Sequence, residues 1–591
     1  MLRPPSLDCL PSSRAVPRAR SQPAPLTQNV VLSSRLLLLT LALPLTAAAQ
    51  MPARPATAPI ELPRTHAPRP TSPAITAADL MTRLYIFADD SMQGRETGTE
   101  GNRRALRYVE RELKRLGLTP MGDGGSYLQK VPLVRRGWAG DFTANVGGTA
   151  LEPWTDLVPL PVRRGVPRGI SGAPVIYGGM LSDAVKSLTV EQATGKVVVV
   201  RVNGLSLGAI PPSSGLARAA GIALLVGAPL PARYTSFFRT PGLSLPTSDA
   251  MTDSVPMTLV LSQRAAQLVF GSEPSALTPL QAGSPITAAA LSFGETPSPA
   301  YNLVAMIAGS DPVLKHQYVA IGAHNDHDGF NQAPVDHDSL HAYQRNAWTL
   351  AGAYAGLPPL NREQAASVRV NLDSLRQLRP ARRDSIYNGA DDDGSGSMAV
   401  LEIAENIAAA RLKPKRSVLF VWHTGEEKGL LGSQWFAEHM PVTRDSIVTQ
   451  INIDMIGRGS LVDTKGGGPA YVGVVGSKRL SSMLGATIDS LATASRTPLD
   501  IDYRLDADGH PENIYCRSDH YQYARFGIPV AFFFTGLHGD YHQVTDEPQY
   551  IDYSHYNRIT NYVRDLLVTV GNGAKPVVDK PKPDPTGQCR Q

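Results

Sequence analysis

The sequence predicts an α/β protein in which a mostly parallel, mixed sheet flanked by helices forms the main domain, with a β-rich domain inserted into it. After Tyr301, short apolar runs typical of buried strands alternate with stretches of helical periodicity, and this alternation indicates a largely parallel sheet. Between residues 152 and 287 the pattern changes to Val-rich runs separated by Gly and Pro clusters, such as Gly195-Lys196-Val197-Val198-Val199-Val200. That change predicts a separate β-rich domain.

Length and composition limit the classes of protein to consider. The chain has 591 residues, which is enough for about three domains. Hydrophobic residues make up 42% and charged residues 18%, values that are typical of globular domains rather than disordered chains. The net charge is +5, and most of the excess lies in residues 1–49, which are rich in Arg. The remainder is nearly neutral, so we expect no nucleic-acid partner.

The first 75 residues predict a leader followed by a linker. Arg35 precedes an apolar run at residues 36–45, and small residues follow it, which is typical of a signal peptide and its cleavage site. We therefore assign residues 1–49 to a signal peptide and expect an exported protein, either periplasmic or secreted. No other run approaches 18 apolar residues, so we expect no integral membrane segment once the signal is removed. Residues 50–75, rich in Pro, Ala and Thr, are assigned to a linker.

The elements of the main domain are predicted in two parts. The first part covers residues 76–151, where Thr76 and Asp79 are typical of a helix start and residues 102–117 place apolar side chains at helical spacing. The second part covers residues 288–570 and contains an insertion at about 328–387 with a predicted helix at 362–378. Residues 571–591, rich in Lys and Pro, are predicted to be disordered. The other elements expected in the second part are strands at 318–323, 417–422 and 450–456 and helices at 395–410 and 430–439.

Acids and histidines gather where the predicted strands end. In open α/β sheets, ligands bind beside the carboxyl ends of the strands, so these side chains are candidates for one site. Imidazole and carboxylate groups without cysteine fit divalent cations, zinc first. Two ions need one bridging carboxylate and about two further ligands each, which leaves one acid as a possible base. The candidates are His324, Asp326, Asp391, Asp392, Asp393, His423, Glu426, Glu427, Asp454 and His542.

Five motifs that contain these residues resemble those of the co-catalytic di-zinc aminopeptidases, a family that also includes glutamate carboxypeptidase, glutaminyl cyclase and the transferrin receptor. The order and spacing of the motifs agree with that family over about residues 78–562. The resemblance implies a zinc-exopeptidase fold, and residues 152–287 resemble the protease-associated domain inserted in many exported, leucyl-type bacterial members. The motifs are His324-Asn325-Asp326, residues 389–396, His423-Thr424-Gly425-Glu426-Glu427, residues 452–457, and Asp540-Tyr541-His542 followed by Asp546.

The resemblance also implies a role for each residue. The expected reaction is hydrolysis of the amino-terminal peptide bond of peptides with a free amino terminus, through a water that bridges two zinc ions. A cis peptide bond is expected between Asp392 and Asp393. The implied metal ligands are His324 and Asp454 for one ion, Glu427 and His542 for the other, and Asp392 as the bridge. The implied catalytic residues are Glu426 as general base, Tyr541 as donor to the oxyanion, and Asp326 as the acid that holds the His324 ring.

Two related functions and one unrelated enzyme class compete with this interpretation. A one-zinc acyltransferase like glutaminyl cyclase and a non-catalytic, receptor-like binding protein share the expected fold. The complete ligand set and the tandem acids Glu426-Glu427 favour the peptidase. Ser206 lies in a Gly-x-Ser-x-Gly sequence typical of a hydrolase nucleophile, but Pro211 and Pro212 follow where that motif needs a helix, so we interpret Ser206 as an ordinary strand-end serine.

The sequence leaves alternatives open for one histidine, two cysteines and the assembly of the chain. His327 competes with His324 as a ligand, but His324 lies nearer the strand and has an acid two residues later, so we prefer His324. Cys516 and Cys589 remain after removal of the signal and can either pair in an oxidising compartment or stay as free thiols. The sequence leaves the oligomeric state and the preferred amino-terminal side chain open.

Overall fold

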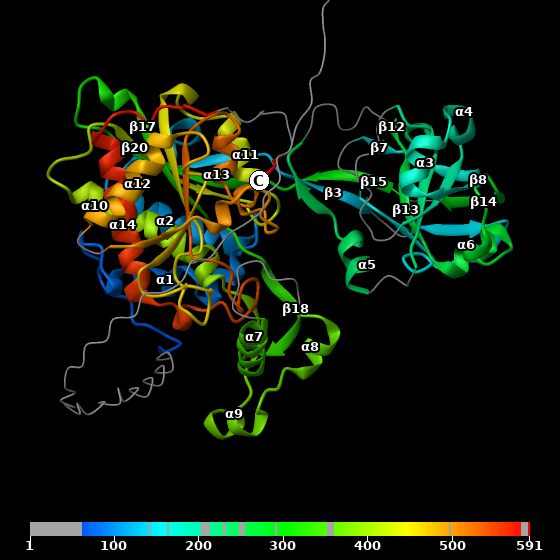
Figure 1. Cartoon of the computed structure of the whole chain (residues 1–591), viewed down its shortest axis with the longest axis horizontal. Coiled ribbons are helices and arrows are strands. Elements are labelled where there is room, and N and C mark those ends of the chain that lie inside the picture. Colours follow the sequence, from blue (N-terminus) through cyan, green and yellow to red (C-terminus); the bar gives the residue numbers. More distant parts are fainter. Residues whose placement is uncertain are drawn as a thin grey trace, which may run out of the picture. The chain divides into compact units, whose positions relative to one another are not determined.

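Buried apolar strands form a nine-stranded mixed sheet at the centre of the main domain (Figure 1). The computed structural model describes residues 62–591 apart from 140–141, 162–164, 203–212, 228–231, 247–253, 290–291, 352–359, 496–497 and 581–588. The strand order is β1-β16-β20-β17-β21-β24-β22-β23, with β2 paired to β16. The four central strands run parallel, and β16 and β22 are antiparallel to them. The strands are β1 (Thr119–Pro120), β2 (Leu128–Val131), β16 (Ala300–Ile307), β17 (Tyr318–His324), β20 (Ser417–His423), β21 (Ile447–Ile453), β22 (Tyr471–Val475), β23 (Asp500–Asp502) and β24 (Val530–Phe534).

Helices cover both faces of this sheet, which is why its central strands are apolar at nearly every position. Alternate residues of a strand point to opposite faces. In β24, Phe533 packs in one buried cluster, whereas Phe532 and Phe534 pack in another. Among the helices, α10 and α14 pack against β17 on the face of Phe533 (Figure 1). The helices are α1 (Ala77–Phe87), α2 (Glu100–Arg115), α10 (Gly396–Ala409), α11 (Leu431–Glu438), α12 (Ser482–Ala494), α13 (His520–Ala524) and α14 (Tyr553–Asn572).

Most of the predicted elements of the main domain occur within a few residues of the expected positions. The side chain of Thr76 accepts a hydrogen bond from the Asp79 N–H and caps α1, as its position in the sequence suggests. The predicted helix at 362–378 is instead two short helices. Asn361 caps the first and Asn371 caps the second, and Val368 has extended backbone between them.

The insertion near residues 328–387 is an antiparallel strand pair with helices between the strands. Gly329 pairs with Tyr387, so the insertion leaves and re-enters the main domain at neighbouring points. Figure 1 shows β18, α7, α8 and α9 together in the green part of the chain. Its elements are β18 (Gly329–Asp336), α7 (His337–Ala351), α8 (Arg362–Ser367), α9 (Leu372–Leu378) and β19 (Arg383–Tyr387).

A second sheet of eight strands forms the β-rich module, in the order β5-β4-β14-β8-β9-β10-β13-β6. The run of four valines is β9, in which Val197 and Val199 belong to one core and Val198 and Val200 to another, so both faces are covered. The sheet also takes in β4 and β5, which precede residue 152. Its strands are β4 (Thr143–Val146), β5 (Thr149–Leu151), β6 (Leu157–Pro159), β8 (Ile170–Met180), β9 (Val197–Arg201), β10 (Gly221–Leu225), β13 (Met257–Leu261) and β14 (Ala282–Ala289).

Smaller elements complete the β-rich module and its connection to the main domain. A three-stranded sheet has the order β11-β3-β15, and β7 pairs with β12. The remaining strands are β3 (Val134–Ala139), β7 (Val166–Pro167), β11 (Gly242–Ser244), β12 (Ser254–Val255) and β15 (Ser292–Pro297). The helices are α3 (Leu181–Ser187), α4 (Val190–Ala193), α5 (Ala232–Arg239) and α6 (Gln263–Phe270).

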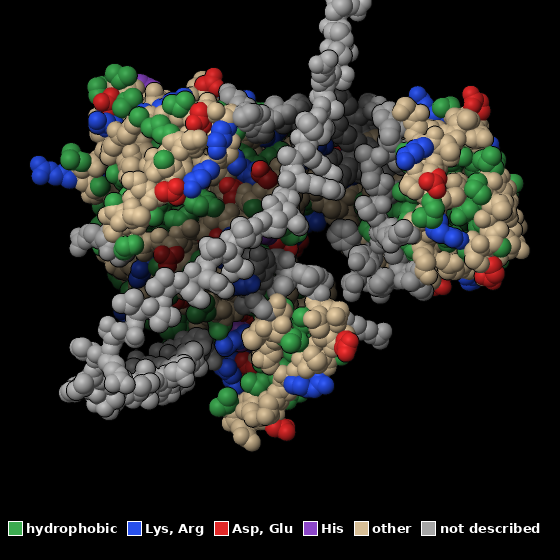
Figure 2. Space-filling model, viewed as in Figure 1, with side chains coloured by type: hydrophobic (Ala, Val, Ile, Leu, Met, Phe, Trp, Pro, Cys, Tyr) green, Lys and Arg blue, Asp and Glu red, His purple; other side chains and the backbone are tan. Residues whose placement is uncertain are grey.

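Some of the predictions concern residues that lie outside the described part of the chain. The proposed signal peptide, residues 50–61 of the linker and Ser206 lie outside the described residues. Across the described residues, none of the helices combines the length and the apolar character needed to cross a bilayer. On the face drawn in Figure 2, acidic and basic side chains are interspersed over the described residues.

The prediction of a disordered tail at 571–591 is wrong for residues 571–580 and 589–591. A disulfide joins Cys589 to Cys516, with 5.7 Å between their Cα atoms. Val578 and Cys589 also pack against a buried cluster of the main domain. The Lys- and Pro-rich composition suggested disorder, and a contact between cysteines 73 residues apart leaves no local pattern that would correct this prediction. Of the two alternatives for the cysteines, the structure has the bridge.

Candidate metal centre

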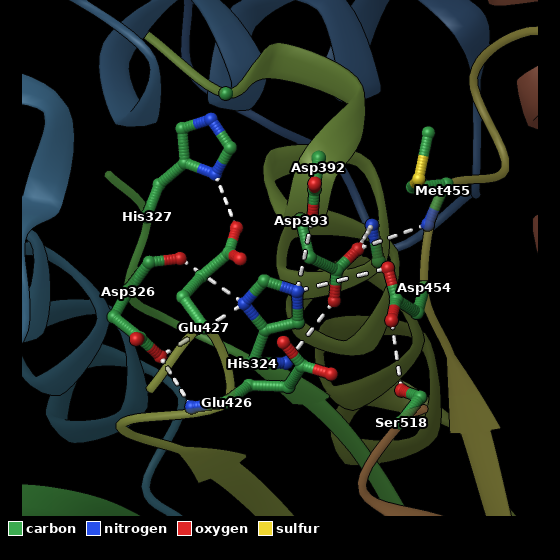
Figure 3. A network of polar contacts seen from close by, with 12 residues as sticks. His324, Asp326, His327, Asp392, Asp393, Glu426, Glu427, Asp454, Met455 and Ser518 are labelled. Atoms are coloured by element: carbon green, nitrogen blue, oxygen red, sulfur yellow. Dashed lines mark hydrogen bonds and ion pairs between the residues drawn. The ribbon is translucent and has the colours of Figure 1, made fainter. Parts of the chain in front are cut away.

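The parallel strands bring the expected ligands to one edge of the sheet. His324 is the last residue of β17, and its neighbour across the sheet is His423 at the end of β20. The loop after β20 carries Glu427, and Asp454 directly follows β21. Asp392 lies in η6 (Ala390–Ser395), the irregular turn that leads into α10. Figure 3 shows His324, Asp392, Glu427 and Asp454 converging from separate elements. His542, in the loop after β24, also reaches Asp392.

Asp392 stands between two pairs of residues, and its two oxygens face different imidazoles. Asp392 Oδ1 lies 3.1 Å from His324 Nε2, and Asp392 Oδ2 lies 3.1 Å from His542 Nε2. The nitrogen of His324 is also 3.7 Å from Asp454 Oδ1, and that of His542 is 3.1 Å from Glu427 Oε2. The five residues therefore form two sets of one imidazole and one acid that share a carboxylate. This arrangement fits two adjacent metal ions with a bridging ligand.

The loop that carries Asp392 is held by contacts to its backbone. Both carboxylate oxygens of Asp546 accept a hydrogen bond from the Asp391 N–H at 3.0 Å, and one of them also accepts the Asp392 N–H at 3.0 Å. The buried Arg95 donates to the carbonyl of Gly389 at 2.9 Å. The peptide bond between Asp392 and Asp393 is cis, which confirms the expectation from the family resemblance.

The His324 ring is oriented by Asp326, but through a different atom from the one expected. Nδ1 of His324 lies 3.0 Å from the backbone carbonyl of Asp326 and 3.9 Å from its carboxylate. That carboxylate instead accepts hydrogen bonds from the Thr97 hydroxyl at 2.6 Å and from the Glu426 N–H at 3.2 Å. An imidazole that binds a metal is usually held through its other nitrogen, and here a carbonyl does so. The acid instead fixes the backbone of the residue expected to act as base.

His327 is close to the site but takes a different position from His324. Its Nδ1 lies 2.7 Å from Glu427 Oε1, the oxygen that does not face His542. His327 therefore orients an expected ligand, while His324 contacts the shared carboxylate. Asp328 plays a comparable part for His542, because its carboxylate lies 3.3 Å from His542 Nδ1.

The acids of the site favour positive charge on its imidazoles. Burial lowers the pKa of His542, but the carboxylates of Asp392 and Glu427 outweigh it and raise that pKa to about 11. Burial and the charge of Asp392 oppose ionisation of Glu427, yet hydrogen bonds from His327 and His542 lower its pKa to about 2. Burial likewise lowers the pKa of His324, and nearby carboxylates, Asp454 foremost, place it well above the ordinary value. Acids therefore draw positive charge to both imidazoles, and nitrogen and oxygen ligands of this kind fit zinc.

A pocket opens directly beside these residues. One side is acidic and carries Glu426, whose pKa is raised well above its ordinary value by burial and by Glu427. Tyr541 lies at the same opening, and its hydroxyl accepts a hydrogen bond from Arg517 at 3.2 Å. The apolar side of the pocket is formed by Met455, Ile514, Phe532, Phe534 and Leu537.

A second cluster of a histidine and two acids lies in and beside the insertion but is already neutralised. His337 Nδ1 is 2.9 Å from Asp384, and its Nε2 is 3.6 Å from Glu547. Arg382 donates to both oxygens of Glu547, at 2.8 and 3.0 Å, and supplies the positive charge that these acids need. We therefore assign this cluster a structural role.

Several residues that complete the site have no role that residue spacing could assign. Asp393 accepts the His324 N–H at 3.0 Å and the Gly396 N–H at 2.8 Å, so it joins β17 to the start of α10. The Ser518 hydroxyl donates to Asp454 at 2.7 Å. In the sequence, Asp393 and Ser518 are marked only by their positions inside or next to a motif. Asp328 follows His327 directly and was counted with the insertion, where no pattern marks it.

Comparisons with known proteins agree with this geometry. Residues 302–567 match the profile of Peptidase family M28. Leupeptin-inactivating enzyme 1 of Streptomyces exfoliatus is 30% identical over 169 residues, which cover 28% of this chain and 33% of that protein. Leucine aminopeptidase 1 of Paracoccidioides brasiliensis (strain Pb03) is 29% identical over 221 residues, which cover 36% of this chain and 53% of that protein. The matches thus span between a third and about half of these curated relatives.

Solved structures with a similar arrangement include an aminopeptidase from Aneurinibacillus sp. strain AM-1. It has a TM-score of 0.48 and 14% identity, and the match covers 86% of this chain and 97% of that one. BSAP, a zinc aminopeptidase from Bacillus subtilis, has a TM-score of 0.45 and 14% identity, with 88% and 100% covered. The matched residues include every expected metal ligand, and residues 302–567 form a Peptidase family M28 domain.

Proposed function

We propose that this protein is an exported, zinc-dependent aminopeptidase that hydrolyses the amino-terminal peptide bond of peptides. The observation that carries the proposal is the position of Asp392, whose two oxygens each lie 3.1 Å from a different imidazole. His324 and Asp454 would hold one zinc ion, and Glu427 and His542 the other. Two ions held there would polarise the scissile carbonyl and make a water molecule more acidic.

Glu426 is the proposed general base. Its carboxylate lines the pocket, and its backbone is fixed by the hydrogen bond from its N–H to Asp326 at 3.2 Å. A raised pKa suits this role, because a more basic carboxylate takes a proton from water more readily and can later give it to the leaving amine.

Tyr541 is the proposed donor to the oxyanion of the tetrahedral intermediate. Arg517 donates to the phenol oxygen at 3.2 Å, so the phenol proton can be directed elsewhere. The phenol group lies in the same pocket as Glu426, which allows one residue to serve the attacking water and the other the carbonyl oxygen.

The apolar side of the pocket supports a preference for apolar amino-terminal side chains. Phe532, Phe534 and Leu537 line it, and a side chain of leucine or phenylalanine would bury apolar surface there. The curated relatives named leucine aminopeptidase support exopeptidase action on such residues.

Export and the identity of the β-rich module are also proposed. The disulfide between Cys516 and Cys589 supports an oxidising compartment, and residues 1–49 would provide the signal peptide. We further propose that residues 152–287 belong to a protease-associated domain that selects substrates, since every expected metal ligand lies outside that range.

A panel of amino-acid anilides and dipeptides, assayed with and without a chelator, tests the function. We expect fastest hydrolysis of leucine or phenylalanine derivatives, loss of activity with the chelator, and about two zinc ions per chain in metal analysis. One zinc ion with cyclisation of amino-terminal glutamine would instead identify a glutaminyl cyclase. Tight zinc binding without turnover of any substrate would identify a binding protein.

A further inference from the structure

Residues 589–591, which we call the strap, are attached to the segment that forms one wall of the pocket. The disulfide links Cys589 to Cys516. The Gln591 side chain accepts a hydrogen bond from the Tyr515 N–H at 2.9 Å and donates to the carbonyls of Leu505 at 2.5 Å and Ala507 at 3.1 Å. One residue thus joins two short 3-10 helices, η8 (Arg504–Asp506) and η9 (Ile514–Cys516).

The strap reaches the pocket through neighbours of the disulfide. Ile514 and Arg517, on either side of Cys516, both line the pocket. Ser518, the next residue, donates to the expected metal ligand Asp454 at 2.7 Å. A displacement of η9 would therefore move the apolar wall and the residue that donates to Tyr541.

Other contacts to η9 come from the buried cluster that includes Ile514 and Tyr515, from the rings of His520 and Tyr521, and from Arg479. The Arg479 guanidinium stacks over the Tyr515 ring with 4.5 Å between its carbon and the ring centroid, and it pairs with Asp506 at 2.6 Å. This side chain supports the same turns as Gln591 but makes no covalent link. The strap adds one disulfide and a set of backbone hydrogen bonds to a region that begins with Asn513 in the left-handed conformation, at φ 52°.

We propose that the strap is a positioning element that holds the pocket wall in the form that binds substrate, with Gln591 as its positioning residue. The inference rests on the proposed aminopeptidase function for its kinetic test. Reduction by an external dithiol would break the bond between Cys516 and Cys589. The dithiol would become a disulfide, and its two electrons and two protons would convert the pair to thiols. Once the strap is released, η9 would be in its binding form for only part of the time.

Three variants of the full chain test the inference on a leucine anilide. Gln591→Ala and the double variant Cys516→Ser/Cys589→Ser should raise KM about tenfold, as expected if the wall is in its binding form for about a tenth of the time. The kcat should change less than about twofold, because bound substrate selects the binding form of the wall and so restores the positions of Arg517 and Ser518. Val577→Ser is the matched control, since Val577 precedes the strap in the sequence and has 60% of its surface exposed, and the KM of this variant should stay unchanged.

Hydrogen exchange of residues 505–518 gives a readout that does not depend on activity. Exchange should increase in Gln591→Ala and in the reduced wild type, and a dithiol should leave the double Cys→Ser variant unaffected. Unfolding temperature and zinc content identify variants that fail to fold. An active wild type whose KM and hydrogen exchange are unchanged in Gln591→Ala would overturn the strap proposal. A wild type that hydrolyses nothing in the panel would overturn the proposed function, while the exchange measurement would still decide the strap.

Discussion

Replacement of Glu426 by Gln separates the proposed base from the proposed metal ligands. The amide keeps the shape of the side chain but cannot accept a proton, and the backbone hydrogen bond of residue 426 to Asp326 at 3.2 Å is retained. Loss of a general base costs about a hundredfold to ten-thousandfold in turnover. In terms of activation free energy, that range corresponds to about 2.7 to 5.4 kcal/mol.

The buried position of Glu426 supports a large loss of turnover when this side chain is replaced. Burial raises the pKa of Glu426 well above its ordinary value, and repulsion from Glu427 and Asp454 adds to it, whereas His324 acts in the opposite direction. A base with a raised pKa holds a proton more strongly once it has taken one from water. We therefore expect kcat to fall steeply in Glu426→Gln while the zinc content stays at the wild-type level.

Glu427→Gln is the matched control, because the neighbouring acid has the same chemistry but different contacts. Its oxygens face His327 at 2.7 Å and His542 at 3.1 Å, within the proposed metal set. This variant should lose zinc on dialysis and recover activity at high zinc concentration. Mass spectrometry of bound zinc beside initial rates on a leucine anilide measures both effects. A Glu426→Gln enzyme with near-normal turnover would refute the assignment of the base.

Three other substitutions test separate parts of the argument. Phe533→Ala, in the fully buried core of β24, should lower the free energy of unfolding by about 3 to 5 kcal/mol, measured by denaturant titration. Burial raises the pKa of Glu402 to about 7 despite its pairing with Arg83, so the folded protein binds this proton more tightly than the unfolded chain does. Stability should therefore fall as pH rises from about 4.5 to about 7, and Glu402→Gln should flatten that slope in thermal unfolding. Asp546→Asn should weaken zinc binding about 10- to 100-fold in a competition titration, because its carboxylate accepts the Asp392 N–H, and unchanged affinity would contradict the role of this contact.

Local patterns were enough to gather the candidate ligands at one edge of the sheet, because most of them follow buried strands, whereas their individual roles came from the family resemblance. Runs of apolar residues located β17, β20 and β21 to within a few residues, and the parallel arrangement then placed the residues after them at one edge. The same patterns failed where contacts are distant in sequence. The tail was predicted to be disordered from its Lys and Pro content, and that composition does not show whether Cys589 pairs with Cys516.

Residue spacing also could not predict which atom of a residue orients its neighbour. The position of Asp326, two residues after His324, suggested that its carboxylate holds the imidazole. The structure uses the carbonyl of the same residue at 3.0 Å and turns the carboxylate toward Thr97 and the Glu426 N–H. Sequence spacing cannot distinguish these arrangements, because a backbone oxygen is available at every position.

The insertion contributes to the support of the loop that carries His542. His341 of α7 lies 2.9 Å from Asp540, which also accepts from Thr545 at 2.7 Å and pairs with Arg458 at 3.2 Å. Since Asp540 precedes Tyr541 and His542 by only one and two residues, these contacts support the loop that carries the proposed oxyanion donor and a proposed metal ligand. The extra length between β17 and η6 therefore contributes to the support of that loop, although it supplies none of the proposed metal ligands.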